Sequence, residues 1–154
     1  MKTMVWHMRF IVDQMLGRLA KYMRFLGYDT YFPDRFTSDD KIIEIAKKDE
    51  RIIITRDKEL AIRFKDSLYV DSKDVYEQLK IVTNHFSLSM DNILTRCSIC
   101  NAVLSSIDKE NVKKKVPDYV FKSQEKFFYC SSCDKVYWYG THTQNILKII
   151  KDAI

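Results

Sequence analysis

Four cysteines constrain this chain more than any other feature of its sequence. They form two Cys-x-x-Cys pairs, one at Cys97 and Cys100 and the other at Cys130 and Cys133. Each pair places two thiolates on a tight turn, where they can occupy adjacent corners of a tetrahedron about 2.3 Å from a zinc ion. Two such pairs separated by a strand-rich insert predict a zinc ribbon. Four thiolates close the coordination shell, so this zinc should stabilise the fold rather than catalyse.

Two disulfides, or four unrelated buried cysteines, are the alternatives. The N-terminus has no signal-peptide pattern, because Asp13 and Gln14 interrupt the apolar run too early. No apolar run reaches the roughly 18 residues that a membrane span needs. We therefore expect a soluble, cytoplasmic protein, in which disulfides are disfavoured. The paired spacing in turn disfavours four unrelated cysteines, and structural zinc is the preferred interpretation.

Before the cysteines, short apolar runs alternate with segments of helical period. The strands are expected at 10–12, 30–32, 51–55 and 67–70, and the helices between Asp13 and Gly27 and at 40–48, 58–64 and 73–86. The first helix should carry Met15 on its apolar face and end at Gly27 in the left-handed conformation, and Asp71 or Ser72 should cap the last. The run 51–55 is apolar and β-branched, which is typical of a strand covered on both faces. The order βαβαβαβα predicts a parallel sheet flanked by helices. No glycine-rich phosphate loop follows any strand, so no nucleotide cofactor is expected.

The character of the sequence changes near residue 91. All four cysteines lie beyond this point, the aromatic residues become denser, and a helical pattern runs from 143 to 150. We therefore divide the 154 residues into an α/β domain, 1–90, and a zinc-ribbon module with a C-terminal helix, 91–154.

Aspartates follow three of the expected strands directly: Asp13, Asp57 and Asp71. In a parallel sheet they gather at one edge, where Asp39, Asp40 or Glu44 can join them from the next helix. Clustered carboxylates repel one another unless a cation neutralises them, and magnesium or manganese suits such ligands. A site of this kind can activate water for phosphodiester hydrolysis. Aspartate is also a good helix N-cap, and the pattern alone leaves both interpretations open.

Basic and aromatic residues suggest a polyanionic partner. The net charge of +5 is compatible with one, and Arg18, Arg24, Arg56 and the run 113–115 can contact phosphates. The aromatic run 137–139 can stack on bases. In the simpler interpretation, the lysines are a solvated run and the aromatic residues pack the small core of the ribbon.

Several motifs resemble one known family, the Mut-seven C-terminal RNase domain family, and they occur in its order. They are Phe10-Ile-Val-Asp-Gln-Met-Leu-Gly-Arg-Leu-Ala20, Leu26-Gly-Tyr-Asp29, Ile54-Thr-Arg-Asp57, Glu77-Gln-Leu79, Arg96-Cys-x-x-Cys-Asn101, Val116-Pro117 and Tyr137-Trp-x-Gly-x-His142. The resemblance covers about residues 8 to 145. It implies a PIN-like nuclease fold with a zinc ribbon on its C-terminal side.

The resemblance also implies a set of catalytic residues. PIN-like nucleases hold divalent metal with acidic residues at the carboxyl edge of the sheet. Carried onto this sequence, these positions are Asp13, Asp57 and Asp40, and the fourth acid is Asp71 or Asp74.

The sequence thus predicts a metal-dependent ribonuclease. Asp13, Asp40, Asp57 and Asp71 would hold magnesium or manganese, Arg18 and Arg56 would position phosphate, and the zinc ribbon would aid RNA binding. The alternative is a non-catalytic RNA- or protein-binding module on a PIN-like scaffold. No oligomeric state is predicted.

Overall fold

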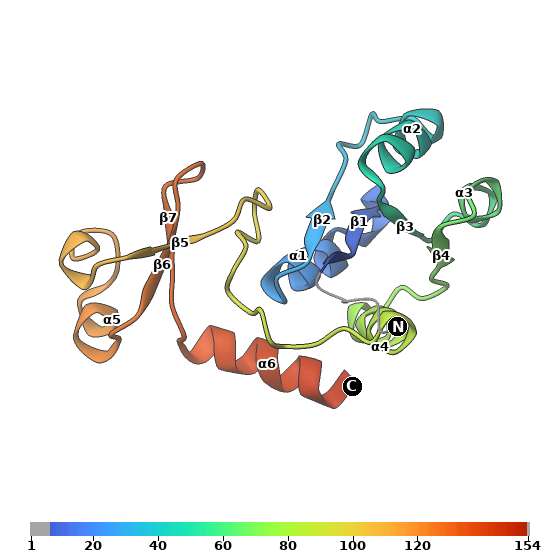
Figure 1. Cartoon of the computed structure of the whole chain (residues 1–154). Coiled ribbons are helices and arrows are strands. Elements are labelled where there is room, and N and C mark those ends of the chain that lie inside the picture. The colour runs from blue at the N-terminus through green and yellow to red at the C-terminus, as the bar shows by residue number, and fades with distance from the viewer. Residues whose placement is uncertain (1–6, 154) are drawn as a thin grey trace.

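The computed structural model describes residues 7–153 (Figure 1). It contains a parallel sheet with its helices, then a small antiparallel sheet, and it ends in a long helix. The first part contains β1 (Arg9–Val12), the 3-10 helix η2 (Gln14–Leu16), α1 (Gly17–Phe25), β2 (Asp29–Tyr31), α2 (Asp39–Asp49), β3 (Ile52–Thr55), α3 (Lys58–Arg63), β4 (Ser67–Tyr69) and α4 (Val75–Phe86). The second part contains β5 (Ser105–Ile107), η3 (Lys109–Asn111), α5 (Asp118–Ser123), β6 (Phe127–Cys130), β7 (Lys135–Tyr137) and α6 (Thr141–Ala153).

The first sheet has four parallel strands in the order β2-β1-β3-β4. Ile11 pairs with Ile53 at its centre, and Thr55 pairs with Tyr69 toward the edge. Because every pair is parallel, the carboxyl ends of all four strands lie at one edge. The predicted α/β fold with a parallel sheet and flanking helices is confirmed.

Both faces of this sheet are covered by helices, as the continuous apolar run of β3 predicted. Phe10, Val12 and Ile54 face a core shared with α1, α4 and α6. Ile11 and Ile53 face the opposite side, against α2 and α3. The side chains of β1 and β3 therefore alternate between two cores, and neither central strand has a solvent face.

The second sheet, β5-β6-β7, is antiparallel and carries the cysteines of the second pair at the β6–β7 turn. Its small core contains Val112, Val120, Phe127 and Val136, with Trp138 packed against it. The core interpretation of the aromatic residues is confirmed for Trp138. The short helices η3 and α5, which the sequence pattern did not predict, interrupt the strand-rich insert.

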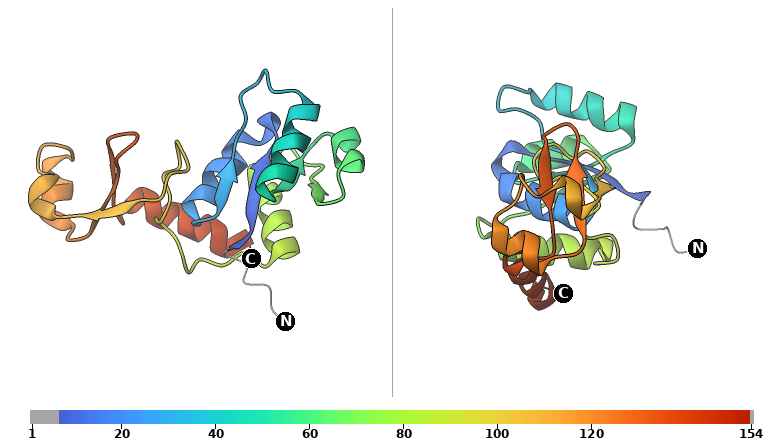
Figure 2. Two further views of the ribbon diagram at one scale, coloured as in Figure 1. Left: turned by 45° about the horizontal axis from the view of Figure 1, so that its top comes forward. Right: turned by 90° about the vertical axis from the view of Figure 1, so that its left-hand side faces the viewer.

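Helix α6 runs from the antiparallel sheet back to the first part of the chain and lies against α4 (Figures 1 and 2). Ile150 and Ala153 are buried in the same core as Phe10 and Leu79. The segments 1–90 and 91–154 thus share one core through this helix, and the boundary near residue 91 stays a prediction. Within residues 7–153, no helix has both the length and the apolar character needed to cross a membrane.

Two local predictions were wrong. Met15, predicted on the apolar face of the first helix, is 62% exposed, because η2 precedes α1 and turns this side chain outward. The N-cap of α4 is Asp74, not Asp71 or Ser72, since the helix begins two residues later than predicted. The Ser72 hydroxyl instead accepts from the backbone N–H of Asp74 and contacts Glu77, so it orders the loop before the helix.

Gly27 ends the α1 segment in the left-handed region, with φ of +95°, as predicted. A Cβ at this position would lie 2.2 Å from the backbone oxygen of Asn92. Gly27→Ala should therefore lower the free energy of unfolding by about 2 kcal/mol or more, because conformational strain and a backbone collision add. Urea unfolding checks this.

Gly17→Ala is the matched control. A Cβ at Gly17 would meet only the ring of Phe32, at 3.3 Å, and this ring is partly exposed. Its effect on stability should stay within about 1 kcal/mol. Equal urea midpoints for the two variants would contradict the role given to Gly27.

Candidate functional site

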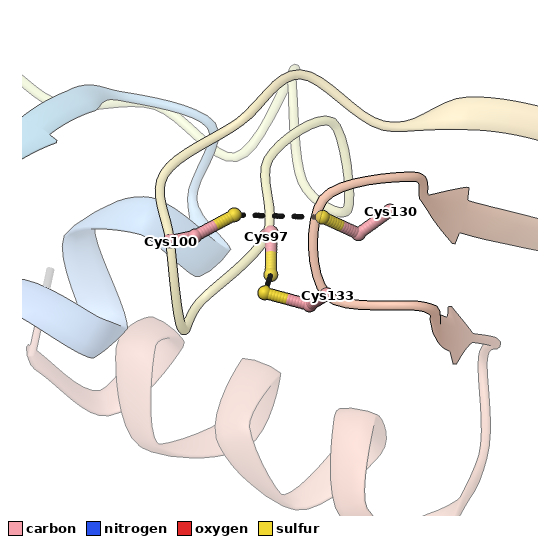
Figure 3. Close-up of side chains that lie close together, drawn as sticks. All are labelled: Cys97, Cys100, Cys130 and Cys133. Carbon is pink, nitrogen blue, oxygen red and sulfur yellow. Dashed lines mark hydrogen bonds between the residues drawn. The ribbon is translucent and has the colours of Figure 1, made fainter.

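The four cysteines converge from two separate loops. Cys97 and Cys100 lie before β5, and Cys130 and Cys133 lie around the β6–β7 turn (Figure 3). Their sulfur atoms all lie within 4.8 Å of one another, and no disulfide joins them. Sγ of Cys97 is 3.9 Å from Sγ of Cys133, and Sγ of Cys100 is 3.4 Å from Sγ of Cys130. Tetrahedral zinc with bonds of about 2.3 Å separates its sulfur ligands by about 3.8 Å, so the arrangement fits zinc.

Hydrogen bonds prepare Cys97 for the thiolate form. Burial acts to raise the pKa of this thiol, but hydrogen bonds from the Tyr137 hydroxyl and from the backbone amides of Cys100 and Ile99 outweigh it and lower the pKa to about 6. The Tyr137 oxygen lies 3.0 Å from Sγ of Cys97. Tyr137 therefore supports the cysteine cluster from β7, a role that the sequence did not reveal.

A buried arginine fastens the first cysteine pair to the parallel sheet. Nε of Arg24 donates to the carbonyl oxygen of Thr30 at 2.8 Å, and Nη1 donates to that of Ile99 at 2.9 Å. Burial lowers the pKa of Arg24, against the attraction of Cys100, Cys97 and Asp29. The prediction that Arg24 contacts phosphate was wrong, because this residue is only 8% exposed and its guanidinium donates to backbone oxygens inside the protein.

Asn101 makes a second link between the cysteine turn and the sheet. Its side-chain oxygen accepts from the backbone N–H of Thr30 at 3.0 Å, and its amide donates to Asp29 at 2.7 Å. Asp29 also accepts from Arg51 at 2.8 Å. Asn101 has φ of +71°, a conformation that asparagine tolerates better than most residues. The turn that carries the first cysteine pair is thus held against the edge strand β2.

At the carboxyl edge of the sheet, Thr55 connects two of the predicted acids. Its hydroxyl donates to Oδ2 of Asp13 at 2.7 Å and accepts from the backbone N–H of Asp57 at 2.9 Å. The side chain of Asp13 makes no capping bond to η2, so the cap interpretation was wrong for this residue. Asp57 does cap α3, through Oδ1, which accepts from the amides of Glu59 and Leu60.

Asp39, the first residue of α2, is close enough to Asp57 and Asp13 for their charges to act on it. Partial burial, and then the negative charges of Asp57 and Asp13, raise the pKa of Asp39. Asp40 forms an ion pair with Arg63 and its side chain is 84% exposed. The sequence named both residues, but only the long-range contacts distinguish them.

The predicted fourth acid, Asp71, follows the edge strand β4. This strand pairs with β3, which precedes Asp57, and Asp71 is exposed. Asp74 is used as the N-cap of α4. Within residues 7–153, the four cysteines are the only group of three or more His, Cys, Asp or Glu placed to share a metal ion. The roles of Asp13, Asp40, Asp57 and Asp71 in metal binding stay predictions.

The two predicted phosphate-binding arginines lie in different surroundings. Arg18 is exposed on the first turn of α1 and lines a groove that faces the second sheet. Arg56 lies between Thr55 and Asp57, and its buried Nε has no hydrogen-bond partner among the described residues. The phosphate contacts of Arg18 and Arg56 stay predictions.

Fold and sites together define an α/β domain with an acidic sheet edge and an attached four-cysteine ribbon. The chain belongs to the Mut7-C RNAse domain family, whose sequence profile matches residues 8–150. The predicted family resemblance is confirmed, and the family description indicates a ribonuclease-like function. Searches of curated proteins and of solved structures gave no match.

Proposed function

We propose that this chain is a metal-dependent ribonuclease whose centre lies at the carboxyl edge of the parallel sheet. Asp13, Asp39 and Asp57 do not lie close enough together in this structure to share one ion, so they would have to draw together to hold magnesium or manganese, which suit carboxylate ligands. When bound, the ion would supply an activated water and stabilise charge on the phosphodiester. The hydrogen bonds through which Thr55 joins Asp13 to the backbone of Asp57 carry this proposal. The raised pKa of Asp39 supports it, because burial and then the charges of Asp57 and Asp13 raise that pKa.

The surrounding residues support the proposal by fixing the carboxylates. Thr55 orients Asp13, and the first amides of α3 hold one oxygen of Asp57. The side chain of Ser38 caps α2 and so sets the position of Asp39. Each acid comes from a different element, which is how sites at the carboxyl edge of parallel sheets are built. Asp40 and Asp71 are further candidates at the rim.

The remaining parts have supporting roles in this proposal. Arg56 and Arg18 would position phosphate groups. Zinc at the four cysteines would stabilise the ribbon, and the ribbon would aid RNA binding. The family description as an RNase domain supports RNA as the substrate.

Cleavage of labelled RNA by the full chain tests the proposal. Single-stranded and structured RNA are incubated with magnesium, with manganese, or with EDTA, and zinc content is measured in every sample. We expect cleavage only when divalent metal is added. Equal cleavage in EDTA by protein that retains zinc would contradict a metal-dependent centre. Folded, zinc-loaded protein that binds RNA without cleaving it would favour the alternative, a non-catalytic binding module.

A further inference from the structure

A groove of about 860 Å³ lies between α1 and the ribbon, outside the acidic edge. Its lining residues come from α1 on one side and from α5 and β7 on the other, and the start of α6 closes one part of it. A groove of this size is within the range of ligand-binding sites. It is formed by both parts of the chain, so neither part alone contains it.

The charge of the groove has one sign. Its charged residues are Arg18 and Lys21 from α1 and Lys135 from β7, and no described residue that lines it is an aspartate or a glutamate. The chain as a whole has 21 acidic residues against 26 basic ones, so a wall without acids is a local feature. None of the three basic residues forms an ion pair with a described residue. Such a surface favours a polyanion.

Aromatic side chains are interleaved with these cations. Tyr22, Tyr119, Tyr137 and Trp138 line the groove. Tyr119 lies outside the core of the ribbon and is 73% exposed, so packing does not explain its position. Aromatic faces beside a basic track are the combination by which proteins hold single-stranded nucleic acid, since unpaired bases stack and phosphates pair with the cations. The bases of a duplex are stacked inside it and cannot reach these rings.

We propose that this groove binds an unpaired segment of RNA, with a base stacked on Tyr119 and phosphates at Lys21 and Lys135. The proposal rests on the proposed ribonuclease function and assigns its substrate class: single-stranded RNA. Arg18 stands at the start of α1, shortly after Asp13 in the chain. An RNA strand that lies in the groove and passes Arg18 therefore leads toward the acidic residues at the carboxyl edge of the parallel sheet.

RNA binding is measured by fluorescence anisotropy with a labelled, unstructured oligonucleotide and with the duplex of the same sequence. The full, zinc-loaded chain carries Asp13→Asn, so that binding is read without cleavage. Tyr119→Ala should weaken single-strand binding about 5- to 150-fold, the usual loss for one stacked base. The control is Tyr76→Ala on α4, another exposed tyrosine, which lies outside the groove and should bind like its parent.

The double variant Lys21→Ala/Lys135→Ala tests the charges. It should lower the slope of log affinity against log salt by about 1.4, or 0.7 for each lost phosphate contact on a single strand. The control Lys47→Ala/Lys80→Ala removes the same charge from exposed positions on α2 and α4. Equal losses in both double variants would overturn the groove in favour of diffuse attraction. Duplex bound as tightly as single strand would overturn it as well.

A second signal comes from Trp138. The chain has two tryptophans, and with Trp6→Phe the emission of Trp138 alone is observed. Single-stranded RNA should change this emission at the concentrations that change the anisotropy, and an unchanged emission would overturn the proposal.

The groove proposal and the ribonuclease proposal can fail independently of each other. Specific groove binding without any cleavage by the wild-type chain would reject the ribonuclease and keep the groove. Cleavage that the groove variants leave unchanged would reject the groove and keep the ribonuclease.

Discussion

Asp13→Asn is expected to reduce the rate of RNA cleavage at least about 100-fold, an increase in the activation barrier of roughly 3 kcal/mol. The substitution keeps the shape of the side chain and an oxygen that can accept from Thr55 at the same position. It removes one of the negative charges that act on Asp39, and so should weaken the proposed binding of a divalent cation. Single-turnover cleavage at saturating RNA measures the effect.

Two neighbouring substitutions on α2 sharpen this test. Asp39→Asn should match the loss caused by Asp13→Asn, because the charges of Asp57 and Asp13 act on Asp39. Asp40→Asn removes the same charge one residue further on, but its carboxylate is paired with Arg63 at the surface. Its effect should stay below about tenfold, since the charge of an exposed, paired carboxylate is well screened. A larger loss for Asp40→Asn than for Asp39→Asn would instead assign the metal-binding role to Asp40, as the family resemblance implied.

RNA binding and stability provide the controls for the aspartate variants. All three should melt at or near the parent temperature and bind single-stranded RNA in metal-free buffer with similar affinity. A loss of cleavage that simply follows a loss of folded protein would say nothing about a metal centre. Full activity of Asp13→Asn in folded protein would reject the proposed function.

The order of elements and the four-cysteine cluster were predictable because both depend on local signals. The strand at 51–55 is recognised from its apolar, β-branched composition, and a Cys-x-x-Cys pair is recognised from the spacing of its own residues. The choice between Asp39 and Asp40 was not predictable in this way. Adjacent residues of a helix point about 100° apart, and the partner that draws Asp40 away, Arg63, lies 23 residues further on.

Arg24 illustrates the same limit. Its position on α1 resembled that of a surface cation, yet it is buried and bonded to the backbone of Ile99, 75 residues away. The helical pattern near the C-terminus was likewise visible, but not that Ile150 would pack in the core of the first sheet. Such contacts depend on how the two parts of the chain meet, which no local period encodes.

Removal of zinc, or Cys130→Ser, is expected to have the largest effect on structure. Structural zinc contributes about 10 kcal/mol or more to the stability of small zinc modules, and the ribbon has only a small apolar core. Hydrogen exchange should therefore rise to unprotected levels in β5, β6 and β7. Metal analysis should give one zinc per chain for the parent protein and less for the variant. Ser132→Ala, an exposed position in the same turn, is the matched control and should retain zinc.

The loss should then spread in a defined direction. Arg24 and Asn101 join the first cysteine turn to Thr30, so β2, at the edge of the parallel sheet, should lose protection next. The central strands β1 and β3 should stay protected, because both their faces remain covered by helices. The groove between α1 and the ribbon would lose one wall, and single-strand binding would fall with it. Unchanged exchange in the ribbon of zinc-free protein would contradict the structural role of the metal, while equal exchange in β1 and β2 would contradict the path through Arg24 and Asn101.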